Sequence, residues 1–223
     1  PDWLKAVFLM MQKVITALKV QKRNPDRLNI ELDGEFAFGL SRLTAAWLKI
    51  GDQLTDEKIS QLLKDDGLEA AYQRALSLIN HKQRTEHEIR TRLAGKGLTD
   101  ELIDKVLVKL RSARLVQDEQ YARMWVETRS EMHPRSRRLI RYELKRKGIS
   151  EDEIDQAVEY MADDESLARG AASRYASRLS GLDWLTFSKK LSGHLARRGF
   201  SYQTVAPIVK ELWQQHENES GNN

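Results

Sequence analysis

The sequence contains no cysteine, which excludes disulfide bonds, thiolate zinc sites and cysteine nucleophiles. This absence fits a reducing compartment, and a cytoplasmic location is expected. Proline and glycine are scarce, with 4 and 12 in 223 residues, and their scarcity favours long helices over a turn-rich β fold. The apolar stretch from Trp3 to Met11 is too short to span a bilayer and lacks a small-residue cleavage site. Residues 1–11 are interpreted as a disordered leader, with an amphipathic anchor as the alternative.

Motifs that perform chemistry are also lacking. The sequence has no Walker motif, and its five histidines are scattered without the HExxH spacing of a zinc site. Asp163-Asp164-Glu165 resembles a metal or acid–base cluster in isolation. It stands at a predicted helix start, however, where acidic side chains cap the helix and complement its dipole. We therefore expect no catalytic residues, no metal and no cofactor, and no enzymatic activity.

Charge is plentiful but nearly balanced. Lys and Arg number 37 against 33 Asp and Glu, which leaves a net charge of +4. Apolar residues make up 40% of the chain and charged residues 31%, a balance typical of a globular protein with a highly charged surface. So small an excess says little by itself, and any binding function depends on where positive charge is concentrated.

Residues 12–66 are predicted to form a small β-containing module. Leu28, Ile30 and Leu32 alternate with polar residues, as in a half-buried strand, and Val14 to Val20 follow a similar period of two. Turn chemistry is present at Arg23-Asn24-Pro25-Asp26, and Asp33-Gly34 suits a tight hairpin. About three antiparallel strands are expected. Helices are expected over residues 41–49 and 55–64, where they could cover one face of the sheet.

A repeated pattern occupies the rest of the chain. Gly97, Gly148 and Gly199 are spaced by 51 residues (148 − 97 and 199 − 148), and the residues around them match in kind. Apolar residues recur four before, eight before and six after each glycine: Leu93, Leu144, Leu195; Ile89, Ile140, Leu191; Ile103, Ile154, Val205. A basic residue precedes each glycine, and a Thr or Ser follows two positions later, as at a helix end followed by the capped start of the next helix.

Each copy follows another predicted helix, over residues 68–80, 119–131 and 165–179, so one repeat contains three helices. The predicted repeats span residues 67–116, 117–162 and 163–217, followed by a disordered tail over residues 218–223. The expected fold is mainly α, with nine helices in three tandem three-helix repeats after a small antiparallel β-containing module.

Positive charge is concentrated in the second repeat, where residues 134–147 carry seven Lys and Arg against one acid, Glu143. With Ile140 and Leu144 facing the core, helical spacing turns a basic stripe outward. The predicted binding residues are Arg135, Arg138, Arg141, Tyr142 and Lys145. The core positions recur in the other repeats but the stripe does not, because only Arg90 and Lys189 carry Lys or Arg at the positions equivalent to residues 138, 141, 142 and 145, so folding does not require the stripe. It is either an ordinary solvated face or a contact for phosphates or an acidic protein surface.

These motifs, in this order, resemble the RecX family of recombination regulators. The resemblance covers residues 14–212 and includes Arg84 to Ile89, Glu143 to Ile149, and Leu195 to Phe200. Asp33 to Phe38 resembles the β extension of longer members. The family resemblance implies three-helix repeats and binding to RecA filaments, which members can block or disassemble, although some act in the opposite sense.

The function expected from this resemblance is binding to RecA–DNA filaments and inhibition of their growth, ATP hydrolysis and strand exchange in recombination and DNA repair. RecA filaments are the expected partner, with single-stranded or filament-bound DNA as a further one; no membrane is expected, and the protein is expected to be a monomer. Two alternatives stay open. The basic stripe alone would support a plain DNA-binding protein, and the repeats alone would support a helical adaptor.

Overall fold

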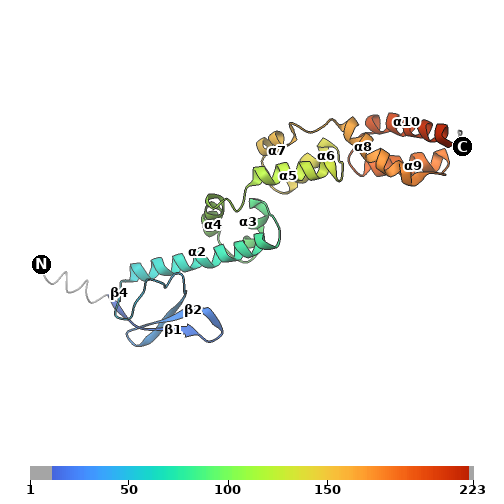
Figure 1. Ribbon diagram of the computed structural model, residues 1–223. Coiled ribbons are helices and arrows are strands. Elements are labelled where there is room, and N and C mark those ends of the chain that lie inside the picture. Colours follow the sequence, from blue (N-terminus) through green and yellow to red (C-terminus); the bar gives the residue numbers. More distant parts are fainter. Residues whose placement is uncertain (1–11, 221–223) are drawn as a thin grey trace. The chain divides into compact units, whose positions relative to one another are not determined.

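The computed structural model describes residues 12–220, which fall into two compact units (Figure 1). The first contains residues 12–82 and 89–115, and the second contains residues 83–88 and 116–220. The leader predicted over residues 1–11 lies outside the described residues, as do residues 221–223 of the predicted tail. Residues 218–220 belong to a helix rather than to a disordered tail.

The first unit begins with a small antiparallel sheet in the order β3-β2-β1-β4. Its strands are β1 (Lys13–Gln21), β2 (Asn24–Leu32), β3 (Glu35–Ser41) and β4 (Gln53–Leu54). Three of them were predicted, whereas the two-residue β4 was not. Asp33 and Gly34 join β2 to β3 with φ angles of 52° and 92°, which confirms the predicted tight hairpin.

The predicted turn at Arg23 to Asp26 is misplaced. The chain turns at residues 22 and 23, and β2 already begins at Asn24. Gln21 pairs with Asn24 and Val20 pairs with Leu28, so Pro25 lies where β2 departs from regular pairing. A proline fits such an irregularity because it has no N–H to donate to a ladder.

One long helix, α2 (Asp56–His81), covers the sheet with its N-terminal half (Figure 1). Leu62 joins the sheet core of Ile15, Ile30 and Leu40. The buried carboxylate of Asp66 accepts hydrogen bonds from the backbone N–H of Ser41 (2.6 Å) and from the guanidinium of Arg27 (2.9 Å). These bonds fasten the helix to the sheet.

Two predictions for this region are wrong. The separate helices expected over residues 55–64 and 68–80 are one continuous α2, since Gly67 does not break it. The predicted helix over residues 41–49 is absent: Ser41 ends β3 and residues 42–47 form turns, because Ala45 is buried in the sheet core and the segment must return the chain to β4.

The first unit ends with α3 (Glu86–Ala94), of which the second unit holds the first three residues, and α4 (Asp100–Ser112). The second unit continues with α5 (Asp118–Glu131), α6 (Arg137–Arg146) and α7 (Glu151–Val158). It closes with α8 (Asp164–Ala176), a short 3-10 turn η1 (Ser177–Leu179), α9 (Trp184–Ala196) and α10 (Tyr202–Ser220). Between Thr85 and Trp213 the structure contains no strand, as the repeats predicted.

The predicted repeat core is confirmed. All nine recurring apolar positions are buried, none more than 3% exposed. Full burial of such side chains contributes about 1.5–3 kcal/mol each. The three glycines have φ angles of 78–86°, and the N–H after each glycine reaches back to the carbonyl of the leucine four residues before that glycine. Thr99, Ser150 and Ser201 then accept hydrogen bonds from the first turn of the next helix.

Within residues 12–220, no helix combines the length and the apolar character needed to cross a membrane.

Candidate functional site

The predicted basic stripe lies on α6. Ile140 and Leu144 are fully buried, which turns the opposite face of this helix outward as expected. Arg138, Tyr142 and Lys145 are exposed, and Arg141 is half-buried.

Two cations of the stripe are already paired. Arg141 contacts Asp155 at 2.5 Å and Glu151 at 3.4 Å, and Lys145 contacts Glu151 at 2.5 Å. Both acids belong to α7, which returns alongside α6 after Gly148. Arg138 has no ion pair with a carboxylate of the side chains that the structure describes. The stripe is therefore more nearly neutral than its sequence indicated, and Arg138 is its uncompensated charge.

The fifth predicted residue, Arg135, lies in a different cluster around Glu143. The Glu143 carboxylate binds Arg135, contacts Arg129 at 3.4 Å, and accepts a hydrogen bond from the indole N–H of Trp125 at 2.9 Å. Burial, followed by the neighbouring Arg129 and Arg198, holds the pKa of Arg135 below its ordinary value. The structure thus does not bring Arg135 onto the stripe but places it in a largely covered ionic cluster.

The second unit contains two junctions between successive three-helix segments, formed by residues at equivalent positions. At the first junction the buried Thr85 donates its hydroxyl to the carbonyl of Lys147 at 2.6 Å. At the second, the backbone N–H of the buried Ser136 donates to the carbonyl of Arg198 at 2.9 Å. Both buried residues cap a helix, α3 or α6, and both partners immediately precede a repeat glycine. The start of one segment is thereby joined to the glycine turn of the next.

The first junction is acidic. Lys147 pairs with Glu88 at 2.9 Å, and the carboxylate of Asp118 accepts the backbone N–H of Glu86 at 3.0 Å. Burial, reinforced by the charges of Glu86, Glu153 and Glu88, raises the pKa of Asp118 to about 6. A buried carboxylate among like charges holds its proton more tightly, which accounts for this direction.

The second junction is basic. His194 stacks on Tyr175 with ring centroids 3.9 Å apart, and Arg198 lies 3.4 Å from the Nδ1 of His194. Burial and then the charges of Arg198, Arg197 and Arg178 lower the pKa of His194 to about 4. His194 is therefore neutral near pH 7 and accepts a hydrogen bond from Arg198.

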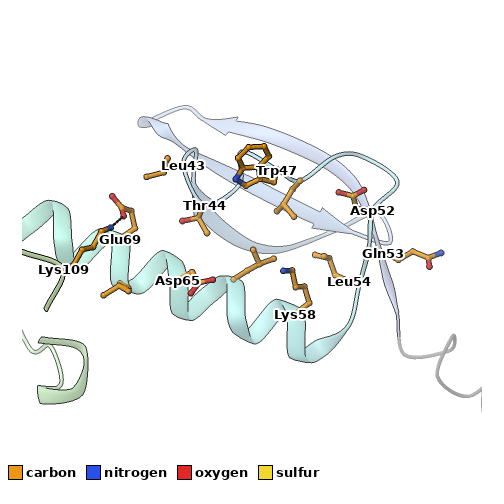
Figure 2. A pocket seen from close by; sticks show the side chains of 13 residues that line it. Leu43, Thr44, Trp47, Asp52, Gln53, Leu54, Lys58, Asp65, Glu69 and Lys109 are labelled. Atoms are coloured by element: carbon orange, nitrogen blue, oxygen red, sulfur yellow. Dashed lines mark hydrogen bonds and ion pairs between the residues drawn. The ribbon is translucent and has the colours of Figure 1, made fainter. Parts of the chain in front are cut away.

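Each unit also has a surface hollow. In the first unit a hollow of about 800 Å³ lies between the loop over residues 42–52 and α2, whose side chains face one another across it (Figure 2). Trp47 lines it and is 88% exposed. In the second unit a hollow of about 680 Å³ lies along α9 and α10, with Trp184, Tyr202 and Trp213 in its wall. The wall of the first hollow carries Asp52, Asp65 and Glu69 together with Lys58 and Lys109, and Glu69 pairs with Lys109 at 2.9 Å. Asp163 serves as a helix cap for α8.

Three models of one family match consecutive parts of the chain. They are the regulatory protein RecX N-terminal domain over residues 13–55, the first RecX three-helix domain over residues 71–110, and the second over residues 118–158. The regulatory protein RecX of Levilactobacillus brevis is 34% identical over 203 residues, which cover 89% of this chain and 76% of that protein. The chain belongs to the RecX family.

Other RecX proteins agree along most of the chain. The regulatory protein RecX of Clostridium acetobutylicum is 27% identical over 93% of this chain and its own full length. A crystal structure of a regulatory protein RecX superposes with a TM-score of 0.67 at 28% identity, covering 89% of this chain and 99% of that one. A RecX crystal structure from Lactobacillus salivarius, 24% identical with a TM-score of 0.55, shares the fold.

The RecX domains coincide with the elements described above. The N-terminal match contains all four strands. The first three-helix match contains the C-terminal part of α2, α3 and most of α4, and the second contains α5, α6 and α7. The relatives are named regulatory proteins.

The cations of the second junction were missed by the sequence analysis. Arg178 belongs to η1, whereas Arg197 and Arg198 follow the last residue of α9, so no single stretch of sequence is as basic as α6. One signal could have found them. Arg198 repeats Lys147, but Leu139 stands where the partner of Lys147, Glu88, stands in the preceding repeat.

Proposed function

We propose that this protein binds RecA filaments assembled on DNA and inhibits their growth, their ATP hydrolysis and strand exchange. Membership of the RecX family over the β module and the helical repeats is the observation that carries the proposal. RecA is the partner that the family resemblance implied. Action in the cytoplasm, as a monomer and without a membrane, belongs to the same proposal.

The inhibition is proposed to need no chemistry in this chain. A protein that occupies sites on an assembly shifts the equilibrium of that assembly by its different affinities for the competing states. In the second unit, the interlocked junctions hold helices and their surface charges in fixed positions, which suits such a binding role. Purified protein without RecA is accordingly expected to hydrolyse no ATP.

The decisive experiment measures ATP hydrolysis by RecA on single-stranded DNA, with and without this protein. Addition at well below one molecule per RecA should slow ATP turnover and shorten filaments seen by electron microscopy. Faster turnover or longer filaments would keep RecA as the partner and reverse the direction of regulation. Unchanged turnover and filament length, with no RecA complex at micromolar concentration, would refute the proposal.

A plain DNA-binding function is the second candidate, and the basic second junction is the observation that favours it. Binding to bare single-stranded DNA and to preformed RecA filaments separates the two. A filament regulator should prefer the filament, whereas a plain DNA-binding protein should bind the uncovered strand at least as tightly.

A further inference from the structure

The two junctions of the second unit join equivalent residues but carry opposite charge. At the first junction, Lys147 lies 2.9 Å from Glu88, so its charge is neutralised. At the second junction Arg198 takes the place of Lys147 and Leu139 takes the place of Glu88. Glu88 is the third residue after the buried cap Thr85, and Leu139 is the third residue after the buried cap Ser136. The second junction thus keeps the cation and has lost its acid.

Among the side chains that the structure describes, no other acid pairs with the cations of the second junction. Arg178, Arg197 and Arg198 form no ion pair with any carboxylate of the side chains described, and the buried Nε of Arg198 has no hydrogen-bond partner there. The neighbouring Arg129 and Arg135 share the single carboxylate of Glu143.

The guanidinium of Arg198 is nevertheless held in place, and the charge of Arg178 acts on the same ring, that of His194. His194, stacked on Tyr175, presents its Nδ1 to the guanidinium of Arg198. Arg197 extends back along α9, with its Nη1 3.4 Å from the position that a Cβ on Gly193 would occupy. Burial and the adjacent Arg197 lower the pKa of Arg198, as expected for cations gathered without a counter-charge.

We propose that Arg178, Arg197 and Arg198 bind backbone phosphates of single-stranded DNA. This site deepens the proposed function, on which it rests, since the strand would be the one that RecA holds. It differs from the α6 stripe, where α7 neutralises two of the cations.

Phosphate fits this cluster better than a single protein carboxylate. The three guanidinium groups, one from η1 and two from the turn after α9, exceed the charge of one carboxylate, whereas a nucleic-acid backbone supplies a series of phosphates. The planar guanidinium also donates two parallel hydrogen bonds to phosphate oxygens. Cations in the last turn complement the dipole of α9, but that role does not require a further arginine from η1.

The test measures binding of the full chain to a fluorescent oligothymidylate by anisotropy over a series of salt concentrations. Arg178→Gln with Arg197→Gln removes two exposed charges of the site. Lys189→Gln with Lys190→Gln is the matched control, because it removes two exposed charges from α9 outside the site. For two lost phosphate contacts the slope of log affinity against log salt should become shallower by about 1.4. Between about 50 and 200 mM salt, the affinity of the site variant should then fall about sevenfold less than that of the wild type.

A second pair of variants tests the missing acid. Leu139→Glu introduces the negative charge that Glu88 carries at the first junction and should weaken DNA binding. Leu139→Gln introduces a side chain of nearly the same shape as glutamate but without the charge, and should weaken DNA binding much less. Circular dichroism checks that each variant is folded. The exposed arginine pair decides the outcome if Leu139→Glu does not fold.

Three results would overturn the phosphate site: no binding of the oligothymidylate at low salt, equal slopes for wild type and the Arg178/Arg197 variant, or an equal change in the lysine control. Weaker capture of DNA-free RecA by the arginine variant, with DNA binding unchanged, would make the cluster a protein contact and likewise overturn the site. ATP hydrolysis by RecA is read separately. Site-dependent DNA binding without any effect on RecA would refute the proposed function and leave the phosphate site standing.

Discussion

The interlocking of the junctions makes a prediction for two glycines with almost the same backbone. Gly97 and Gly199 have φ angles of 80° and 86°, so alanine at either position is strained by about 1–2 kcal/mol. Around Gly97 an added Cβ would meet nothing within 4 Å. At Gly199 it would lie 2.5 Å from the Oγ of Ser136 and 2.7 Å from the Cβ of Leu139. Overpacking of this kind costs about 1–3 kcal/mol more.

Gly199→Ala should therefore lower the free energy of unfolding of its unit by about 2–5 kcal/mol, against about 1–2 kcal/mol for Gly97→Ala. Hydrogen exchange by mass spectrometry locates the effect. Gly199→Ala should increase amide exchange in α6, where the clashing residues lie, as well as in its own turn. Gly97→Ala should affect its own turn alone. Equal destabilisation by the two variants, or exchange confined to the turn around Gly199, would refute the interlocking of the second junction.

Three further substitutions test the clusters of the second unit by urea unfolding. Since burial raises the pKa of Asp118 from 3.8 to about 6, the folded state binds its proton more tightly than the unfolded chain does, so stability should rise as pH falls from about 7 to about 4. Asp118→Asn should remove this dependence and add about 1 kcal/mol near pH 7.5, allowing for solvent screening; a steeper dependence in the variant would contradict the assignment. Glu143→Gln should cost about 1–3 kcal/mol, because Arg129 and Arg135 lose their shared charge, and an unchanged midpoint would show that the cluster contributes nothing. Thr85→Val removes a hydroxyl that both caps α3 and donates across the first junction, and should cost about 1–2 kcal/mol where a surface Thr→Val change costs little.

The repeat core was predictable from the sequence because each of its parts is local. Leucine four residues before glycine, a basic residue just before that glycine and Thr or Ser two residues after it are all set by the geometry of one helix end. The same locality explains why Asp33-Gly34 was predicted correctly as a hairpin. A pattern of this kind needs no knowledge of what packs against it.

The continuous α2 was not predictable in this way. Gly67 disfavours a helix by about 1 kcal/mol, and the sequence around it was taken as a boundary. In the structure, Asp66 binds the sheet on one side of this glycine, and Ala71 and Ala75 are buried on the other. The stabilisation from these tertiary contacts exceeds the small cost of placing a glycine inside the helix.

The binding residues were harder still, because net charge at a surface depends on what folds next to it. Arg141 and Lys145 are neutralised by acids that come after the next turn, and the stripe was judged from α6 alone. The uncompensated arginines, in contrast, are brought together by packing of α8 and η1 against α9. No single stretch of sequence shows which cations will lie beside an acid in the folded protein and which will not.

The 26-residue α2 has a mechanical consequence for the first unit. Its first half packs on the sheet through Leu62 and is hydrogen-bonded to it through Asp66. Its second half contributes the buried Ala71 and Ala75 to the helical repeat. Because α2 is one continuous helix, it connects the sheet rigidly to the first repeat, with no hinge between them. Each residue inserted near Gly67 would turn the sheet by about 100° relative to the repeat, because an α-helix has 3.6 residues per turn. The orientation of the β module is therefore set by the first repeat. Insertions into α2 that leave both cores intact should change this orientation in steps.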